Sequence, residues 1–191
     1  MQALAPNEML KVLKVASASK RNHAMILCAF RFGMRASEVC GLRLSDIDVK
    51  DGAITIRRLK GSRTSVFALA NVQGQPLLSV ARVLNAWLEE RKTWQDASDF
   101  VFVSQKGGKL DRSAFFRMFQ SVATEAGMPP EKRHPHCCKH SLGFAMVSAN
   151  RSLTTVQNAL GHRSVASTGI YAQPSREQVD HAVQATMLEL F

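Results

Sequence analysis

A predicted antiparallel hairpin inside a mostly helical chain limits the folds open to this sequence. Residues 53–59 alternate apolar and polar side chains after the Asp51-Gly52 turn, and residues 64–69 form a second candidate strand beyond the basic segment 60–63. The pattern predicts one antiparallel hairpin. Apolar residues recur at helical spacing over most of the remaining chain, so the predicted fold class is mainly α with a small antiparallel β-sheet (α+β).

The helical segments have recognisable start and stop residues. A first helix is expected after Asn7 as its N-cap, and Asp111 is expected to cap a later one. A third short strand is expected over residues 100–103, and Trp87 and Trp94 are expected in the core. The other predicted helices cover residues 21–32, 37–40, 75–92 and 112–126, the last with Phe115, Phe116, Met118 and Phe119 as core, and several more follow Cys137, separated by Asn150, Gly161 and Pro174.

Composition excludes several classes of protein. With 191 residues and 46% hydrophobic residues, the chain can bury a core and is not disordered. It has no run of 18 apolar residues and no signal peptide, so we expect a soluble, cytoplasmic protein that does not enter a membrane. Four cysteines, two of them adjacent, do not form the pattern of a disulfide framework.

The charge is strongly positive and unevenly spread. The net charge is +10 with a pI near 10.0, and residues 1–63 alone hold 12 basic and 5 acidic side chains. Such a balance indicates a polyanionic partner, with a merely solvated basic surface as the alternative.

One tyrosine stands at an informative distance from a histidine. Tyr171 is the only tyrosine of the chain and follows His162, in a Leu-Gly-His step, by nine residues. Upstream lie His136 and Lys139, and much earlier a Gly-Met-Arg-Ala-Ser-Glu segment that contains Arg35. Cleaving a phosphodiester without a metal needs an oxygen nucleophile, cations for the phosphate oxygens and an acid for the leaving oxygen, and these residue types supply all three.

In order and spacing these segments resemble the catalytic domain of the tyrosine recombinases, the phage-integrase family, from about Leu4 to about Pro174. The resemblance implies that Tyr171 is the nucleophile and that Lys60, at the hairpin tip, is the general acid. It also implies phosphate binding by Arg35, His136, Lys139 and His162, support from Glu38 and His140, and further DNA contacts by Arg57, Arg58 and Arg63.

The resemblance further implies a site-specific recombinase that cleaves and rejoins DNA through a 3′-phosphotyrosyl intermediate, without a metal or another cofactor. Its partner would be double-stranded DNA with inverted-repeat sites, bound by four copies of a chain that is a monomer in solution. Residues 1–174 would form the catalytic domain. Residues 175–191 would form a tail helix that docks on a neighbouring protomer, or else packs within its own chain. The sequence around Arg35 is similar to that of the compact fimbrial phase-variation recombinases, which lack an N-terminal clamp domain. The other interpretation is that the chain is a trimmed piece of a longer integrase.

Lys139 departs from the family pattern, which has arginine at this position. Lysine keeps the charge but loses the planar fork that meets two phosphate oxygens, and losing one donor to a transition-state oxyanion costs roughly 10²–10³ in rate. We therefore expect phosphate binding to survive and turnover to slow. The substitution also leaves open a DNA-binding accessory protein of the same fold, while a relaxing topoisomerase with the same chemistry is a further alternative. An engineered change, a natural variant and a decayed enzyme all fit the lysine.

A metal site is the remaining alternative for the histidine-rich segment. Structural zinc sites usually draw their ligands from two separated pairs, whereas these candidates lie within seven residues. The sequence therefore predicts no metal at His134, His136, Cys137, Cys138 and His140.

Overall fold

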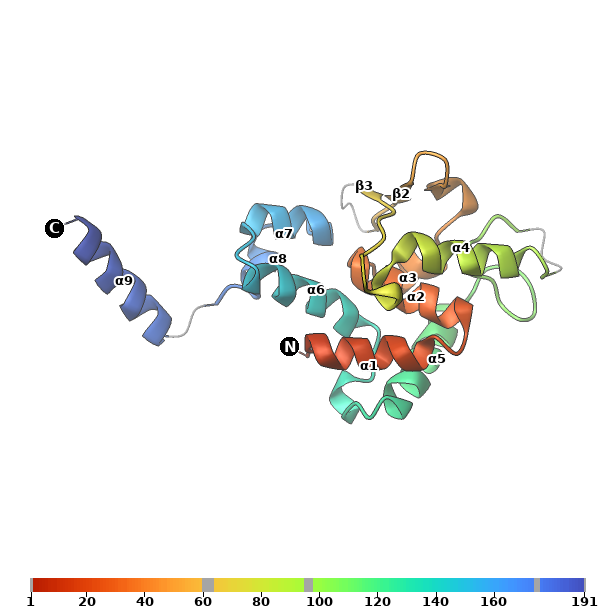
Figure 1. The fold of residues 1–191 in the computed structure, drawn as a ribbon, viewed down its shortest axis with the longest axis horizontal. Helices are drawn as coiled ribbons and strands as arrows, with labels where there is room; N and C mark the ends of the chain where they lie inside the picture. The colour runs from red at the N-terminus through yellow and green to blue at the C-terminus, as the bar shows by residue number, and fades with distance from the viewer. Residues whose placement is uncertain (1, 60–63, 95–97, 174–175, 191) are drawn as a thin grey trace.

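The computed structural model describes residues 2–59, 64–94, 98–173 and 176–190, and most of this part of the chain is helical (Figure 1). Short 3₁₀ turns cover Leu44–Asp46, Pro76–Leu78 and Pro130–Lys132. The helices are α1 (Pro6–Ala16), α2 (Lys20–Arg31), α3 (Ala36–Cys40), α4 (Val80–Arg91), α5 (Arg112–Glu125), α6 (His136–Ser148), α7 (Leu153–Leu160), α8 (Ala166–Gly169) and α9 (Arg176–Leu190).

The sheet has three antiparallel strands in the order β1-β2-β3, namely β1 (Ile47–Asp48), β2 (Ala53–Ile56) and β3 (Ser65–Ala68). Ile54 pairs with Ile47 on one side and with Phe67 on the other, which confirms the predicted hairpin. The predicted strand at residues 100–103 is wrong, because this segment makes only isolated bridges at Phe100 and Val103. Its side chains are apolar because they fill the core, and β1 is the third strand instead.

Helix boundaries follow local capping chemistry. Asp111 caps α5 as predicted, since its carboxylate accepts a hydrogen bond from the amide of Ser113 at 2.7 Å. Asn7 is not a cap: α1 begins at Pro6, and the Glu8 carboxylate accepts a hydrogen bond from the amide of Ala5 at 2.7 Å. The predicted helix over 75–92 is divided at Ser79 into a 3₁₀ turn and α4.

Helix α2 lies at the centre of the body and packs against α1, α4 and α6. Trp87 is fully buried and donates its indole N–H to the carbonyl of Val101, as expected of a core tryptophan with a satisfied polar atom. Phe115 and Phe119 of α5 are also buried, but Phe116 is exposed, which corrects its assignment to the core. All four cysteines are buried and free.

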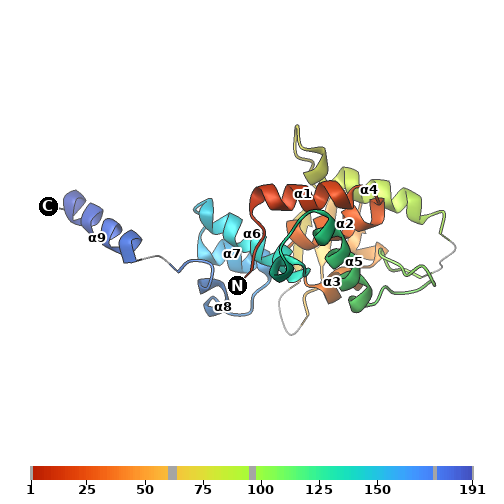
Figure 2. The ribbon, with the colours of Figure 1, turned by 90° about the horizontal axis from the view of Figure 1, so that it is seen from below.

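Helices α6, α7 and α8 form a smaller cluster beside this body, and α9 stands away from both in two perpendicular views (Figures 1 and 2). None of the described helices is long and apolar enough to span a bilayer. The exposed apolar side chains of α9 are Val179, Val183, Met187, Leu188 and Leu190.

Candidate active site

The first wall of the site is the turn between α2 and α3. Gly33 adopts a left-handed conformation (φ 55°), which redirects the chain so that Arg35 becomes the N-cap of α3. The carboxylate of Glu38 accepts hydrogen bonds from the backbone amide of Arg35 at 2.9 Å and from its guanidinium at 2.8 Å. Arg35 remains 28% exposed. One buried acid therefore fixes both the backbone and the side chain of this arginine.

Glu38 stays charged although it is buried. Burial favours the neutral acid, but hydrogen bonds from the amides of Arg35 and Leu59 and the charge of Arg58 outweigh it, so the pKa of Glu38 lies below its ordinary value. The amide of Leu59 and the guanidinium of Arg58 each donate to this carboxylate at 3.2 Å. Glu38 thus links the Arg35 turn to the segment that follows β2.

Lys139 lies on α6 with only 1% of its surface exposed. Its ammonium donates to the carbonyls of Gly33, at 3.0 Å, and Leu160, so it joins the ends of α2 and α7. Burial, together with the charges of Arg35 and Arg58, lowers the pKa of Lys139 to about 7. The two carbonyls occupy two of the three N–H donors of an ammonium.

His136 and His140 stand one turn apart on α6, with their rings 4.4 Å apart in an edge-to-face arrangement. His140 Nδ1 lies 2.9 Å from the hydroxyl oxygen of Tyr171. Burial, reinforced by neighbouring positive charge, lowers the pKa of His136 and brings that of His140 to about 4. Both imidazoles are therefore neutral at pH 7.

Tyr171 sits in a tight socket and is 5% exposed. Its ring packs against the edge of Phe144 at 5.1 Å and parallel to His162 at 6.1 Å. A Cβ atom on Gly143 would lie only 2.7 Å from this ring, so a glycine is needed for the α6 backbone to approach it. Burial raises the pKa of Tyr171 to about 12.

His162 follows the C-terminal end of α7. Gly161 caps this helix in the left-handed conformation (φ 61°), and His162 Nδ1 lies 3.0 Å from the hydroxyl oxygen of Thr168. Burial, followed by the charges of Lys139 and Arg35, lowers the pKa of His162 to about 4. Thr168, which orients this ring, has no signal in the sequence that distinguishes it from any other helical threonine.

The predicted site residues do not all come together. The structure gathers Arg35, Glu38, Lys139, His162 and Tyr171 around the junction of α2, α6 and α7, with His136 and His140 beside them. Lys60 and Arg63 fall outside the described residues.

The two neighbouring arginines of the hairpin differ sharply. Arg57 is exposed over 66% of its side chain and forms an ion pair with Asp46 at 2.6 Å. The side chain of Arg58 has 0% exposure and faces inward, which corrects its assignment as a DNA contact, because a phosphate cannot reach the guanidinium.

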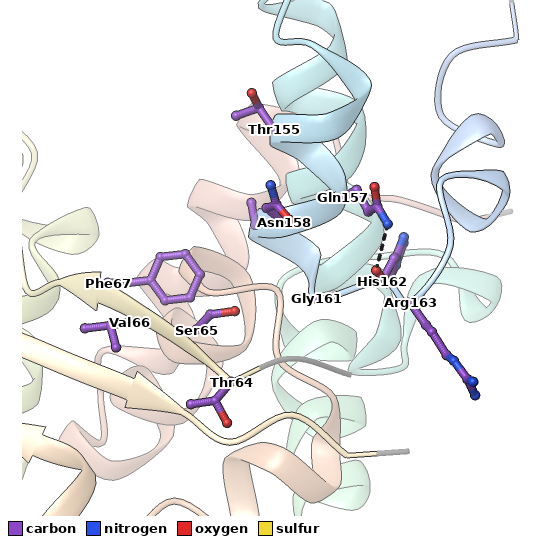
Figure 3. A pocket seen from close by; sticks show the side chains of 11 residues that line it. Thr64, Ser65, Val66, Phe67, Thr155, Gln157, Asn158, Gly161, His162 and Arg163 are labelled. Carbon is purple, nitrogen blue, oxygen red and sulfur yellow. Dashed lines mark hydrogen bonds between the residues drawn. The ribbon is translucent and has the colours of Figure 1, made fainter. Parts of the chain in front are cut away.

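Two hollows open beside this cluster. A cleft of about 830 Å³ lies between β3 and the end of α7, with Phe67 on one side and Asn158, His162 and Arg163 on the other (Figure 3). A second, of about 530 Å³, lies beside His136 and is lined in part by Arg112 and Arg117 of α5, both exposed. Sequence reasoning did not single out these two arginines, although their place on the polar face of residues 112–126 was a usable signal.

The histidine and cysteine side chains of α6 and the residues before it do not converge on one point. His134 Nε2 lies 3.3 Å from Cys137 Sγ. No group of three or more potential metal ligands occurs within residues 2–59, 64–94, 98–173 and 176–190.

The lone tyrosine allows its environment to be tested directly. We expect the phenol to stay un-ionised in the folded protein at pH 10–11, because its pKa is raised to about 12, whereas the urea-unfolded chain should titrate near the ordinary value of 10.0. Absorbance at 295 nm against pH reports this one group. Equal midpoints for the folded and unfolded chains would show that Tyr171 is not buried in solution.

Comparison with known proteins shows the family of the chain. A model of the phage integrase family matches residues 2–178. The type 1 fimbriae regulatory protein FimB of Escherichia coli K12 is 36% identical over 172 residues, which cover 88% of this chain and 82% of FimB. The tyrosine recombinase XerC of Pseudomonas syringae pv. syringae is 33% identical over 153 residues, 79% of this chain but 47% of XerC.

Solved structures show the same fold. The crystal structure of XerA recombinase matches with a TM-score of 0.79 and 25% identity, covering 97% of this chain and 65% of XerA. XerH bound to its difH substrate matches in fold with a TM-score of 0.76 and 23% identity, over 96% of this chain and 54% of XerH. With this fold, these relatives and a family model that spans nearly the whole chain, the protein belongs to the phage integrase family and is a tyrosine-type site-specific recombinase.

Proposed function

We propose that Tyr171 attacks a phosphate of double-stranded DNA, forming a 3′-phosphotyrosyl bond and releasing a 5′-hydroxyl. The observation that carries this proposal is the packing of the lone tyrosine parallel to His162, beside the end of α7 that Lys139 binds and near the charge of Arg35. The 5′-hydroxyl of a partner strand then attacks the phosphotyrosyl phosphorus, which restores the tyrosine and joins the strands. Both steps conserve the number of phosphoester bonds, so no external energy source is needed.

Each site residue has a distinct part in this proposal. Arg35 contacts a non-bridging oxygen because its guanidinium is held by Glu38 yet partly exposed. Lys139 supplies positive charge beneath the phosphate while its buried ammonium stays bonded to the carbonyls of Gly33 and Leu160. His136 and His162, neutral at pH 7, donate or accept hydrogen bonds at the phosphate. Lys60 protonates the leaving 5′-oxygen.

Burial disfavours the ionised form of the Tyr171 phenol. To attack, Tyr171 must therefore break its hydrogen bond with His140 and move out of this buried position. We assign His140 the role of holding the nucleophile in reserve until DNA is bound. Arg57 and Arg63 contact the DNA backbone and place it without reading its sequence.

The proposed substrate is a pair of inverted-repeat sites on which four protomers assemble from monomers, in the cytoplasm. Helix α9 carries an apolar face that its own chain leaves exposed, which supports docking of residues 175–191 on a neighbouring protomer of the catalytic domain 1–174. Light scattering of the double variant Val183→Asp, Met187→Asp tests this. We expect unchanged monomers in free solution and loss of the tetramer on DNA; a tetramer that persists would contradict the docking.

The direct test of the function uses nicked suicide duplexes built from inverted repeats that flank the gene. A cleaved strand loses its short 5′-hydroxyl fragment, so the covalent intermediate accumulates and runs as a shifted band on a denaturing gel. We expect this band with the unchanged protein. Tight binding of the duplexes without any covalent band would contradict the proposal.

Lys139 gives the reaction an unusual pH dependence. We expect single-turnover cleavage to fall as pH rises from 7 to 9, because a lysine with a pKa of about 7 loses its charge there. A bound phosphate raises the pKa of Lys139. Above that pKa the cleavage rate falls by up to about tenfold per pH unit. Lys139→Arg should abolish this fall and cleave roughly 10–100 times faster at pH 8. If the cleavage rates of both proteins decline equally with pH, or if arginine gives no faster cleavage, lysine at position 139 does not limit the reaction.

The same pKa has a consequence for folding. The unfolded lysine titrates near 10.5, so between about pH 7 and 10.5 the folded state binds fewer protons than the unfolded chain. The contribution of this group to the free energy of unfolding therefore rises with pH across that window.

A DNA-binding accessory protein is the second candidate function. The observation that favours it is the commitment of the Lys139 ammonium to two backbone carbonyls, which draws it away from a phosphate. The suicide-duplex assay separates the two, since an accessory protein would bind the inverted repeats without forming the covalent band.

A further inference from the structure

The side chain of Arg58 is fully enclosed next to the site, and the phosphate chemistry makes no use of it. One guanidinium nitrogen, Nη1, donates to the carbonyl of Gly33 at 3.0 Å and to Glu38 at 3.2 Å. The other, Nη2, donates to the carbonyls of Phe32 and Ala159, both at 2.7 Å. A side chain from the hairpin thus binds the ends of two helices that are far apart in the sequence.

The carbonyls at the C-terminal ends of α2 and α7 would otherwise lack partners. The last carbonyls of a helix have no intrahelical donor and carry partial negative charge, so two such ends placed together repel each other. Arg58 bridges them through Phe32, Gly33 and Ala159, while Lys139 bridges the same two ends through Gly33 and Leu160. These two buried cations hold the helix ends together.

Glycine at position 161 is adapted to this arginine. A Cβ atom there would lie 2.6 Å from Arg58 Nε and 2.8 Å from its Cδ, so the close approach requires a residue without a side chain. His162 is the next residue, and its amide donates to the carbonyl of Gln157 at 3.0 Å. The position of Arg58 therefore determines where the α7 end, and with it His162, can lie.

We propose that Arg58 is a positioning residue for recombination, which holds the end of α7 so that His162 faces the phosphate bound by Arg35. This inference rests on the proposed function of the site. Arg58 touches no substrate and acts through the Ala159 carbonyl and the packing of Gly161. Its bond to Glu38 connects the same clamp to the Arg35 turn.

The first test compares Arg58→Lys with Arg91→Lys. Arg91 is a matched control, because it is another buried arginine that donates to two carbonyls, of Ser98 and Phe100, away from the site. Lysine keeps the charge beside Glu38 but lacks the fork needed to reach Ala159 as well. We expect Arg58→Lys to lower single-turnover cleavage about 100-fold, as misplacement by about 1 Å does, with DNA affinity within about threefold. Equal losses in the two variants would overturn the proposal.

A double-mutant cycle separates positioning from loss of stability. If Arg58 acts through His162, then Arg58→Lys should slow a His162→Asn protein by no more than about threefold, because the imidazole that it positions is gone. Arg91→Lys should combine with His162→Asn multiplicatively. A full 100-fold further loss when Arg58→Lys is added to His162→Asn would show that Arg58 does not work through His162.

Hydrogen exchange gives a readout that needs no activity. In Arg58→Lys the amides of Gly161 and His162 should exchange at least about tenfold faster, while those of Arg91→Lys stay unchanged. Unchanged exchange at these amides in Arg58→Lys would overturn the proposal even if cleavage falls. A protein that forms no covalent band at all contradicts the proposed function, and exchange still decides the role of Arg58.

A second pair of variants keeps the inference testable if Arg58→Lys does not fold. Gly161→Ala places a methyl group against Arg58, whereas Gly127→Ala adds the same group at a similar left-handed position (φ 75°) with nothing within 4 Å. Both share the backbone strain, so the difference between them isolates the contact with Arg58. We expect faster exchange at His162 only in Gly161→Ala; the same result in both would overturn the proposal.

Discussion

Replacing Tyr171 with phenylalanine is expected to abolish the covalent protein–DNA band, a loss of at least about 10⁴-fold in single-turnover cleavage. The ring keeps its contacts with Phe144 and His162, while the hydroxyl that becomes the phosphoester oxygen is lost. No other tyrosine exists in the chain to replace it. The measurement is the fraction of nicked suicide duplex shifted on a denaturing gel over time.

DNA affinity serves as the control for this variant. Gel shift on an intact duplex should give a dissociation constant within about threefold of the unchanged protein, because Tyr171 is buried before attack and adds little to binding. The free energy of unfolding should change little, since only the hydrogen bond with His140 is removed. A covalent band that persists in the phenylalanine variant would show that another side chain is the nucleophile.

Replacing Arg35 with alanine is expected to slow cleavage by roughly 10²–10³-fold at saturating DNA, because one preorganised donor to the phosphate oxygens is lost. The effect is large because Glu38 holds both the backbone amide and the guanidinium of Arg35, so little reorganisation is needed when charge develops. Single-turnover rates on the suicide duplex, measured at several DNA concentrations, separate this loss of rate from a loss of affinity.

Two further variants define what the Arg35 result means. Lys92→Ala removes an exposed lysine of the surface pair with Glu89 and should leave the rate unchanged. Glu38→Gln keeps the size of the side chain but weakens its hold on Arg35, and we expect part of the Arg35→Ala defect. If the Arg35→Ala protein cleaves within about threefold of the rate of the unchanged protein, Arg35 takes no part in the reaction.

The sequence was sufficient for the hairpin and for most helices, and several of the predicted site residues lie close together in the fold. His162 and Tyr171, nine residues apart in the sequence, have their rings packed together in the fold. They meet because Gly161 ends α7 and the short α8 returns the chain toward α6. Glu38 was also readable, since an acid three residues after the N-cap reaches back to the cap amide.

The features that the sequence did not reveal depend on contacts between distant segments. Arg57 and Arg58 are neighbours in one basic run after the end of β2, and their side chains lie on an exposed and a covered side of this segment. Which side is covered is decided by α7, about 100 residues later, so the burial of Arg58 has no local signal. Residues 100–103 were predicted as a strand because a short apolar run that fills the core has the same sequence pattern whether or not it pairs with a neighbouring strand.

Mass spectrometry of the covalent intermediate tests the central claim most directly. Trypsin releases the peptide 164–176, in which Tyr171 is the sole tyrosine. After nuclease trimming of the trapped suicide duplex, we expect this peptide to carry a nucleotide joined through its 3′-phosphate to the phenolic oxygen. A nucleotide on any other residue, a 5′-phosphate linkage, or an unmodified peptide from a protein that binds the site tightly would contradict the account.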